Sequence, residues 1–169
     1  PELYRKMQTS ARATAKGLLM FSAAHDDGSP KIAESYNMVG ATSISDILVF
    51  VHDDVVFLSD GWDNKIINAL ELGFDVVGAV GSKEYSGGLI FDAGAEHSSG
   101  KMVGNVDGKR VVKLMTHRAE IEPVKVLDGM FLAVSRSHFS RNCFDEQFDG
   151  LFYYDLDYCL RSKCAVVDI

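Results

Sequence analysis

Residues 47–58, ILVFVHDDVVFL, constrain the fold of this chain more than any other stretch. The first five are uninterrupted apolar residues, mostly β-branched or aromatic, a run typical of a strand buried on both faces of a parallel sheet. The run ends abruptly at His52, Asp53 and Asp54. Open α/β sheets bind ligands beyond the carboxyl ends of their strands, so we expect this acidic turn to lie at a ligand-binding edge of the sheet.

Two adjacent carboxylates favour a bound cation at this position. Asp53 and Asp54 repel each other unless a cation lies beside them, and oxygen ligands suit Mg²⁺ or Mn²⁺. The alternative is that the pair only ends the strand and caps the next element, because an Asp pair is a weak motif. Both interpretations stay open from the pair alone.

The bulk properties exclude several classes of protein. A chain of 169 residues with 47% hydrophobic residues is long enough for one domain with a core. Its net charge of -7 and the lack of a basic stripe argue against nucleic acid as a partner. No apolar run approaches the ~20 residues of a membrane span, so we expect no transmembrane segment. The three cysteines have no CxxC spacing, which predicts reduced thiols and a cytoplasmic location.

The order of the segments predicts an α/β fold. The chain is predicted to form a strand at 47–51, then a helix capped by Ser59 or Asp60, then a strand at 74–80. Short connections between these elements are the pattern of a parallel crossover. We therefore expect a mostly parallel central sheet flanked by helices, with a short antiparallel addition. Further helices are predicted at 2–16, 31–42 and 153–162, and further strands at 17–24, 89–91, 110–115, 124–134 and 165–169.

Three motifs follow one another along the chain: ILVFVHDDV, then VLDGMFLAVSRSHF, then FDEQFDG with YYDLDYCLR shortly after. In this order they resemble the DxD strand, the acceptor-side strand and the FDE.F…EDxDLCxR signature of family 2-like glycosyltransferases with the GT-A type fold. DGSPKIAESYN, which ends in Asn37, is similar to the helix that precedes the DxD strand. The resemblance covers residues 17 to 169. It implies one GT-A-like domain, of the nucleotide-diphospho-sugar transferase type, over residues 1–169 as a fragment or a reduced version.

The resemblance also implies roles for individual residues. His52, Asp53 and Asp54 take the D-x-D positions on the donor side, with Asp54 as the metal ligand at the donor diphosphate. Asp155 matches the carboxylate that acts as base on the acceptor hydroxyl. A helix start is the alternative account of Asp155, because acidic residues complement the dipole there.

Further positions near the donor nucleotide are implied at Asn37, Asp27 and Gly129. Two residues depart from the family pattern: His52 replaces the first Asp of DxD, and Tyr154 replaces the Glu of the ED pair.

These roles predict a metal-assisted glycosyltransferase that uses Mn²⁺ or Mg²⁺. Its donor is a nucleotide-sugar, UDP-linked, its acceptor a carbohydrate or other hydroxyl, and the resemblance implies inversion at the anomeric carbon. The leaving diphosphate needs its charge neutralised and the acceptor hydroxyl needs a base, which a metal at Asp54 and the Asp155 carboxylate supply. The two departures favour the alternative of a non-catalytic nucleotide- or sugar-binding module. We expect Phe148, Phe152 and Tyr153 in the core rather than in a sugar-stacking surface.

Overall fold

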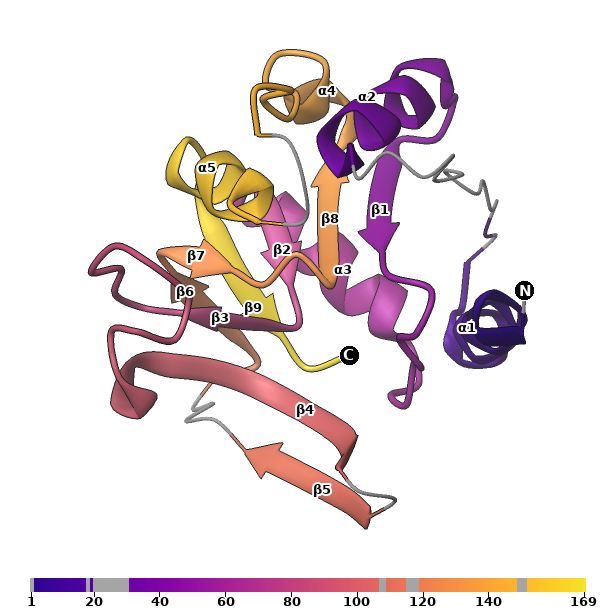
Figure 1. The fold of residues 1–169 in the computed structure, drawn as a ribbon. Coiled ribbons are helices and arrows are strands. Elements are labelled where there is room, and N and C mark those ends of the chain that lie inside the picture. The colour runs from indigo at the N-terminus through magenta and orange to yellow at the C-terminus, as the bar shows by residue number, and fades with distance from the viewer. Residues whose placement is uncertain (1, 18, 20–30, 107–108, 115–118, 149–151) are drawn as a thin grey trace.

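The computed structural model describes residues 2–17, 19, 31–106, 109–114, 119–148 and 152–169. Figure 1 shows a central sheet with helices on both faces and a second sheet beside it. In spatial order the central sheet contains β1 Ile47–Val51, β8 Phe131–Ser135, β2 Val76–Gly78, β9 Cys164–Val167 and β6 Ile121–Val124. The second sheet contains β5 Lys109–Leu114, β4 Ser98–Val106, β3 Val80–Ser82 and β7 Val126–Leu127. The α/β class is confirmed, and so is the antiparallel addition.

The prediction of a mostly parallel central sheet is wrong. Of the pairings in this sheet, β2 with β9 is parallel, whereas β1 with β8, β8 with β2 and β9 with β6 are antiparallel. The helix α3 Trp62–Glu71 does return the chain so that β1 and β2 run in the same direction. However, β8 enters between them from a distant part of the sequence, and local patterns carry no signal of that pairing.

The position of β1 explains why its burial differs from the prediction. Among the described residues β1 lies at the edge of the central sheet, with β8 as its neighbour. Leu48 and Phe50 are buried against one core cluster. The alternate side chains Ile47, Val49 and Val51 are only partly buried against the other cluster.

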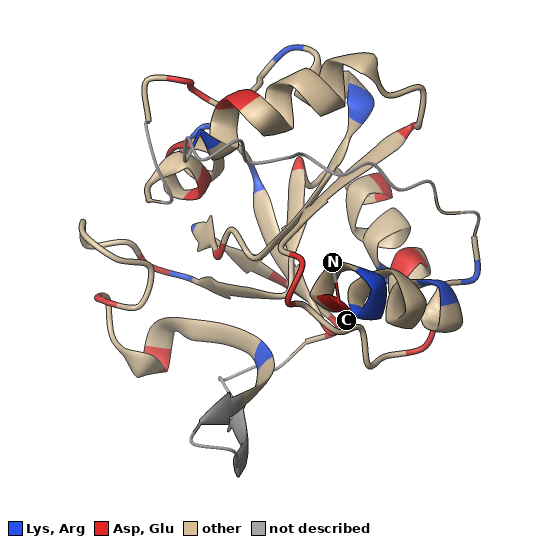
Figure 2. Cartoon of the chain, turned by 45° about the vertical axis from the view of Figure 1, so that its right-hand side comes forward, with Lys and Arg blue, Asp and Glu red and all other residues tan. Residues whose placement is uncertain are grey.

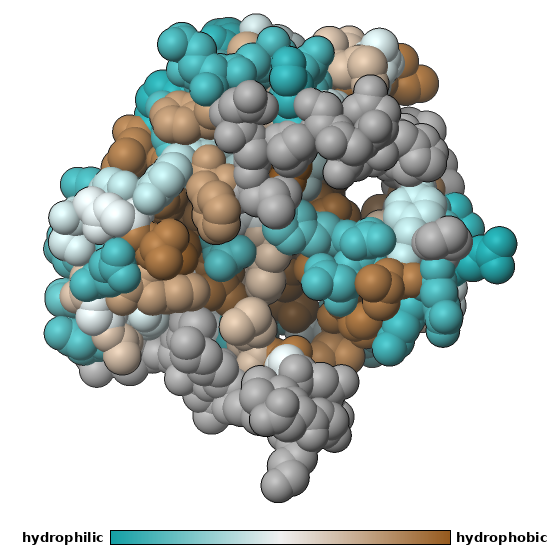
Figure 3. Space-filling model, in the orientation of Figure 1, coloured by the Kyte–Doolittle hydropathy of each residue, from teal (hydrophilic) through white to brown (hydrophobic). Residues whose placement is uncertain are grey.

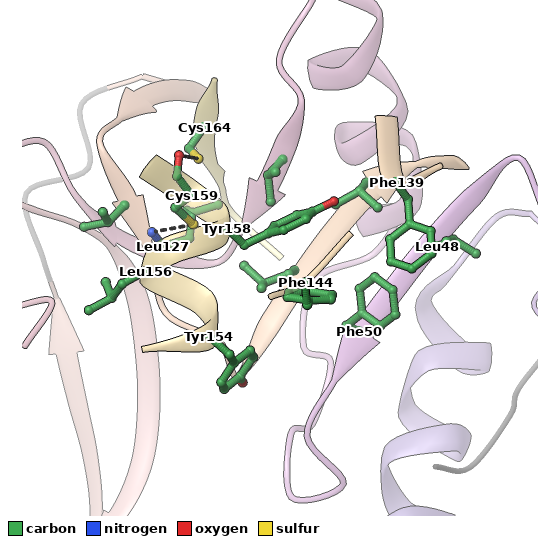
Figure 4. Close-up of a cluster of buried hydrophobic side chains, with 14 of the residues drawn as sticks. Leu48, Phe50, Leu127, Phe139, Phe144, Tyr154, Leu156, Tyr158, Cys159 and Cys164 are labelled. Carbon is green, nitrogen blue, oxygen red and sulfur yellow. Dashed lines mark hydrogen bonds between the residues drawn. The ribbon is translucent and has the colours of Figure 1, made fainter. Parts of the chain in front are cut away.

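The two core clusters lie on opposite faces of the central sheet. One packs under α2 Ile32–Thr42, α4 Arg136–Phe139 and α5 Tyr154–Leu160. Figure 4 shows its aromatic members, with Phe144 between Phe50 of β1 and the two tyrosines of α5, Tyr154 and Tyr158. The other cluster packs under α1 Glu2–Thr14 and α3. On that face Met7 and Ala11 of α1 are buried, and the Trp62 ring nitrogen donates to the Ala11 carbonyl at 3.4 Å. Both faces of the sheet are therefore covered.

A buried ion pair joins the two sheets. Glu122 of β6 is 7% exposed, and its Oε1 lies 2.6 Å from Nζ of Lys83, which directly follows β3. Its other oxygen accepts a short hydrogen bond from Ser99 of β4. These contacts tie β3 and β4 of the second sheet to β6 of the central sheet.

Most of the predicted elements are present, with local differences. The expected strand at 89–91 is wrong, because these residues form turns between β3 and the 3₁₀ helix η1 Ala95–His97. Helix α3 begins after Gly61 rather than at Ser59 or Asp60, since Gly61 takes the left-handed conformation at φ 69°. Most of the predicted strand 17–24, the loop that follows it and Asp27 lie outside the described residues. No helix in the described part of the chain is long and apolar enough to cross a membrane.

Candidate active site

The carboxyl end of β1 meets the amino end of β8. Val51 pairs with Phe131, and the ladder continues one residue further because the His52 N–H donates to the Met130 carbonyl at 3.1 Å. The acidic turn after β1 therefore lies beside the turn 128–130 that leads into β8. Both turns lie at the edge where β1, β2 and β9 end, the edge at which α/β sheets bind ligands.

The turn before β8 accepts only glycine at its centre. Asp128 closes it, with Oδ1 accepting from the Met130 N–H at 3.0 Å. The Gly129 N–H donates to Asp155 Oδ2 at 2.8 Å, and the Gly129 carbonyl accepts from the Tyr154 hydroxyl at 3.3 Å. A Cβ on Gly129 would overlap the Tyr154 hydroxyl and lie 2.9 Å from Asp155 Oδ2. Gly129 thus brings the backbone within reach of both side chains.

The two departures from the family pattern are in contact with each other. His52 Nε2 lies 3.2 Å from the Tyr154 hydroxyl oxygen. Tyr154 is 2% exposed, and its hydroxyl serves both His52 and the Gly129 carbonyl. A phenol donates one hydrogen bond and accepts others, so both contacts form together when Nε2 carries the ring proton. A histidine–tyrosine pair therefore stands where the family pattern places two carboxylates.

Aromatic rings form the wall behind this pair. The Tyr36 ring stacks on Phe50 at 4.8 Å between centroids and meets the Tyr154 ring edge-on at 6.0 Å. Burial, together with the charge of Asp155, raises the pKa of Tyr36 to about 12. Burial likewise raises the pKa of Tyr154 well above its usual value. Both phenols therefore keep their protons near neutral pH, and the Tyr154 hydroxyl donates to the Gly129 carbonyl.

Asp155 is held at the start of α5 by backbone donors. Its Oδ1 accepts from the Leu156 N–H at 2.9 Å, and its Oδ2 accepts from Gly129. Burial raises the pKa of Asp155 above its usual range, in spite of the backbone donors Leu156 and Gly129, and the charge of Asp128 raises it further. A positioned carboxylate with a raised pKa is suited to general base chemistry near neutral pH.

The far end of α5 is fastened by a second polar cluster. His138 lies 3.3 Å from Asp75 through Nδ1 and 3.1 Å from the Ser162 hydroxyl through Nε2. The order Asp–His–Ser resembles a hydrolytic triad, but the Ser162 hydroxyl donates to the Tyr158 carbonyl at 2.8 Å. Burial lowers the pKa of His138, although Asp75 opposes the change. The cluster anchors α5 and thereby holds Asp155 in place.

Asp53 and Asp54 are exposed in the turn after β1, which the Val55 N–H closes on the His52 carbonyl at 3.3 Å. Within the described ranges no three His, Cys, Asp or Glu residues gather as a metal-binding group. The residues still fit a divalent cation, because Mg²⁺ is commonly held by one or two carboxylates with substrate phosphates and water. Figure 2 shows acidic residues on several turns and no single stripe of basic residues among the coloured part of the chain.

Asn37 has a structural partner in the loop that carries the FDE motif. Its amide donates to the Phe144 carbonyl at 2.9 Å and to Glu146 Oε1 at 2.9 Å, and it accepts from the Phe144 N–H at 3.0 Å. In this arrangement the amide holds the loop, and a donor-binding role for Asn37 stays a prediction. Asp157 pairs with Arg161, four residues further along the chain, at 2.6 Å.

The Tyr154 hydroxyl thus joins His52 to Gly129, and a backbone hydrogen bond joins Gly129 to Asp155. Asp53 and Asp54 lie on the turn that continues from His52. Sequence reasoning missed the joining role of Tyr154 and the wall formed by Tyr36. One signal for the role of Tyr154 was available in the sequence: His52 and Tyr154 both depart from the family pattern, and paired departures suggest that the two residues are in contact.

A comparison with protein families agrees with this arrangement. The model of the Glycosyltransferase like family matches residues 21–169. The chain belongs to this family. In a search of curated proteins, none matched it. The match confirms the resemblance to family 2-like glycosyltransferases, and the matched region of this glycosyltransferase-like chain contains the acidic turn, the Gly129 turn and the start of α5.

Proposed function

We propose that this glycosyltransferase-like chain moves a sugar from a nucleotide-sugar, UDP-linked, to an acceptor hydroxyl with inversion at the anomeric carbon. The observation that supports the proposal is the contact between His52 and Tyr154 at 3.2 Å. It joins the acidic turn on the donor side to the helix that carries Asp155. The turn assigned to the donor is therefore in contact, through His52, with the helix that carries the carboxylate assigned to the acceptor.

In the proposed reaction Asp155 takes the proton of the acceptor hydroxyl. The acceptor oxygen forms a bond to the anomeric carbon, while the bond from that carbon to the diphosphate oxygen breaks and its electron pair leaves with UDP. Each Asp155 oxygen accepts one backbone hydrogen bond, so each keeps a lone pair for the proton. Burial raises the pKa of Asp155, which makes its carboxylate a stronger base toward the acceptor proton.

The proposal assigns the donor side to the turn after β1. Asp54, with Asp53 beside it, would hold Mn²⁺ or Mg²⁺, and such an ion supplies positive charge to the departing diphosphate. His52, Asn37 and Gly129 are proposed to lie along the donor nucleotide. A net charge of -7 makes an intervening cation necessary for a diphosphate to approach this chain closely.

Two observations favour the alternative of a non-catalytic nucleotide- or sugar-binding module. The described residues contain no ready-made group of three metal ligands. In addition, His52 and Tyr154 stand where the family pattern has carboxylates, which lowers the negative charge available for a cation. The cysteines are free, with Cys143 exposed, which fits the proposed location in a reducing compartment such as the cytoplasm.

Turnover of UDP-sugars separates the two functions. The assay measures UDP release from UDP-glucose, UDP-galactose and UDP-N-acetylglucosamine, with water or added sugars as acceptor. Asp155→Asn is expected to lower kcat by about 10²–10⁴-fold, the range for loss of a general base. Asp157→Asn, two residues along α5, is the matched control and is expected to retain turnover. UDP binding without turnover in the wild-type chain would support the binding module.

A further inference from the structure

Two aromatic side chains directly before α5 are exposed. Phe152 is 67% exposed and Tyr153 is 45% exposed, so the expectation of a core position is wrong for this aromatic pair. Phe148 is partly buried and packs against the core beneath α5, as expected. In Figure 3 apolar residues reach the surface in the region where Figure 1 places α5 and β7. Exposed large aromatic residues at a functional site commonly mark a binding surface.

The backbone of Tyr153 adds a second observation. Tyr153 has a φ of 69°, and among the described residues it is the only non-glycine residue with a positive φ. This conformation is strained for an L-residue. Burial of the ring does not offset this strain, because the side chain remains exposed. Such strain persists where the surrounding structure or function requires it, and Tyr153 lies two residues before Asp155.

We propose that the aromatic pair Phe152 and Tyr153 forms the acceptor subsite, and that the acceptor is an uncharged carbohydrate whose C–H face stacks on these rings. This inference rests on the proposed function. The acceptor hydroxyl must come within hydrogen-bond reach of Asp155, so the rest of the acceptor lies over the surface next to the start of α5. Aromatic rings offer an apolar face for a pyranose, and the Tyr153 hydroxyl adds a polar edge.

The charges around this surface favour a neutral acceptor. Asp155 and Asp157 lie in the first turn of α5, and the charge of Asp128 acts on Asp155. A phosphorylated or carboxylated acceptor would be repelled by Asp155 and Asp128, and Arg161, which directly follows α5, is already paired with Asp157. An uncharged sugar avoids this repulsion, and one of its hydroxyls can donate to Asp155.

Saturation-transfer NMR on the chain with UDP and the diamagnetic ion Mg²⁺ tests the subsite. The probes are methyl β-glucoside, methyl β-galactoside and methyl β-N-acetylglucosaminide, with glycerol as a hydroxylated probe that has no pyranose face. We expect saturation of the ring C–H protons of at least one pyranoside and none for glycerol. Phe152→Ser and Tyr153→Asn should weaken pyranoside binding about five-fold or more, the usual cost of truncating a central aromatic contact.

The variants separate the role of the ring from that of the backbone. Tyr153→Asn removes the ring but tolerates the left-handed conformation, and Tyr153→Phe keeps the ring and should retain pyranoside binding. Leu72→Ser removes a side chain that is 70% exposed on α3 and should bind like the wild type. Pyranoside signals equal to glycerol, or unchanged in Phe152→Ser, would overturn the subsite if calorimetry shows that the wild type binds UDP. Absence of UDP binding in the wild type would instead overturn the proposed function.

Discussion

Two buried tyrosines on α5 provide an internal comparison for the proposed network. The Tyr154 hydroxyl contacts His52 at 3.2 Å and the Gly129 carbonyl at 3.3 Å. The Tyr158 hydroxyl, one turn further along α5, is buried without a hydrogen-bond partner among the described residues. Replacing each tyrosine by phenylalanine removes the same atom from the same helix. The expected changes in the free energy of unfolding have opposite signs.

The magnitudes follow from what each hydroxyl leaves behind. Tyr154→Phe removes its hydrogen bonds and leaves the buried Gly129 carbonyl and the half-buried His52 ring without this partner, which costs about 1–3 kcal/mol. Tyr158→Phe removes a polar group that folding strips of water without a replacement, so it should stabilise the chain by about 1 kcal/mol. The ring of Tyr158 stacks on Phe144 at 4.3 Å, and phenylalanine keeps that contact.

Urea unfolding followed by circular dichroism measures both effects. With a slope of about 2 kcal/mol per molar urea, the midpoint should fall by roughly 0.5–1.5 M for Tyr154→Phe and rise by roughly 0.5 M for Tyr158→Phe. Shifts of equal size and direction would refute the reasoning, because they would show that the contacts of the Tyr154 hydroxyl contribute nothing specific.

Three further predictions concern the same region. Gly129→Ala should destabilise the chain by about 2 kcal/mol or more and abolish turnover, because its Cβ overlaps the Tyr154 hydroxyl; urea unfolding and UDP release measure the two effects. Turnover should fall as the pH drops through the raised pKa of Asp155, above the usual 3.8, and a pH–rate profile with an acid limb at or below 3.8 would contradict this role. Burial lowers the pKa of His138, so between this lowered value and 6.5 the unfolded chain binds more protons and stability falls as the pH falls; His138→Gln should reduce that dependence in urea unfolding at pH 5.5 and 7.5.

The sequence predicts the parts of the site that depend on local pattern. The apolar run before His52 forms β1, and the interruption at Asp128 and Gly129 marks the turn into β8. The family motif places Asp155 in the first turn of a helix, where the structure also has it. These features depend on residue type and spacing within short windows, and such signals survive folding.

Other features depend on long-range contacts that short windows do not contain. The insertion of β8 between β1 and β2 joins residues more than fifty positions apart. For this reason the central sheet was wrongly predicted to be mostly parallel. The contact between His52 and Tyr154 joins residues 102 positions apart, so it could not be predicted without the fold. The exposure of Phe152 and Tyr153 was also missed, because aromatic residues are more often buried than exposed.

The most direct test of the donor site is a calorimetric titration of the wild-type chain with UDP, with and without Mn²⁺. We expect binding that requires Mn²⁺ in the wild type, is lost in Asp54→Ala, and is retained in Asp60→Ala, which removes another exposed carboxylate close by in the sequence. Binding of UDP that is equally strong without Mn²⁺, or unchanged in Asp54→Ala, would contradict the account of a cation shared between the acidic turn and the donor diphosphate.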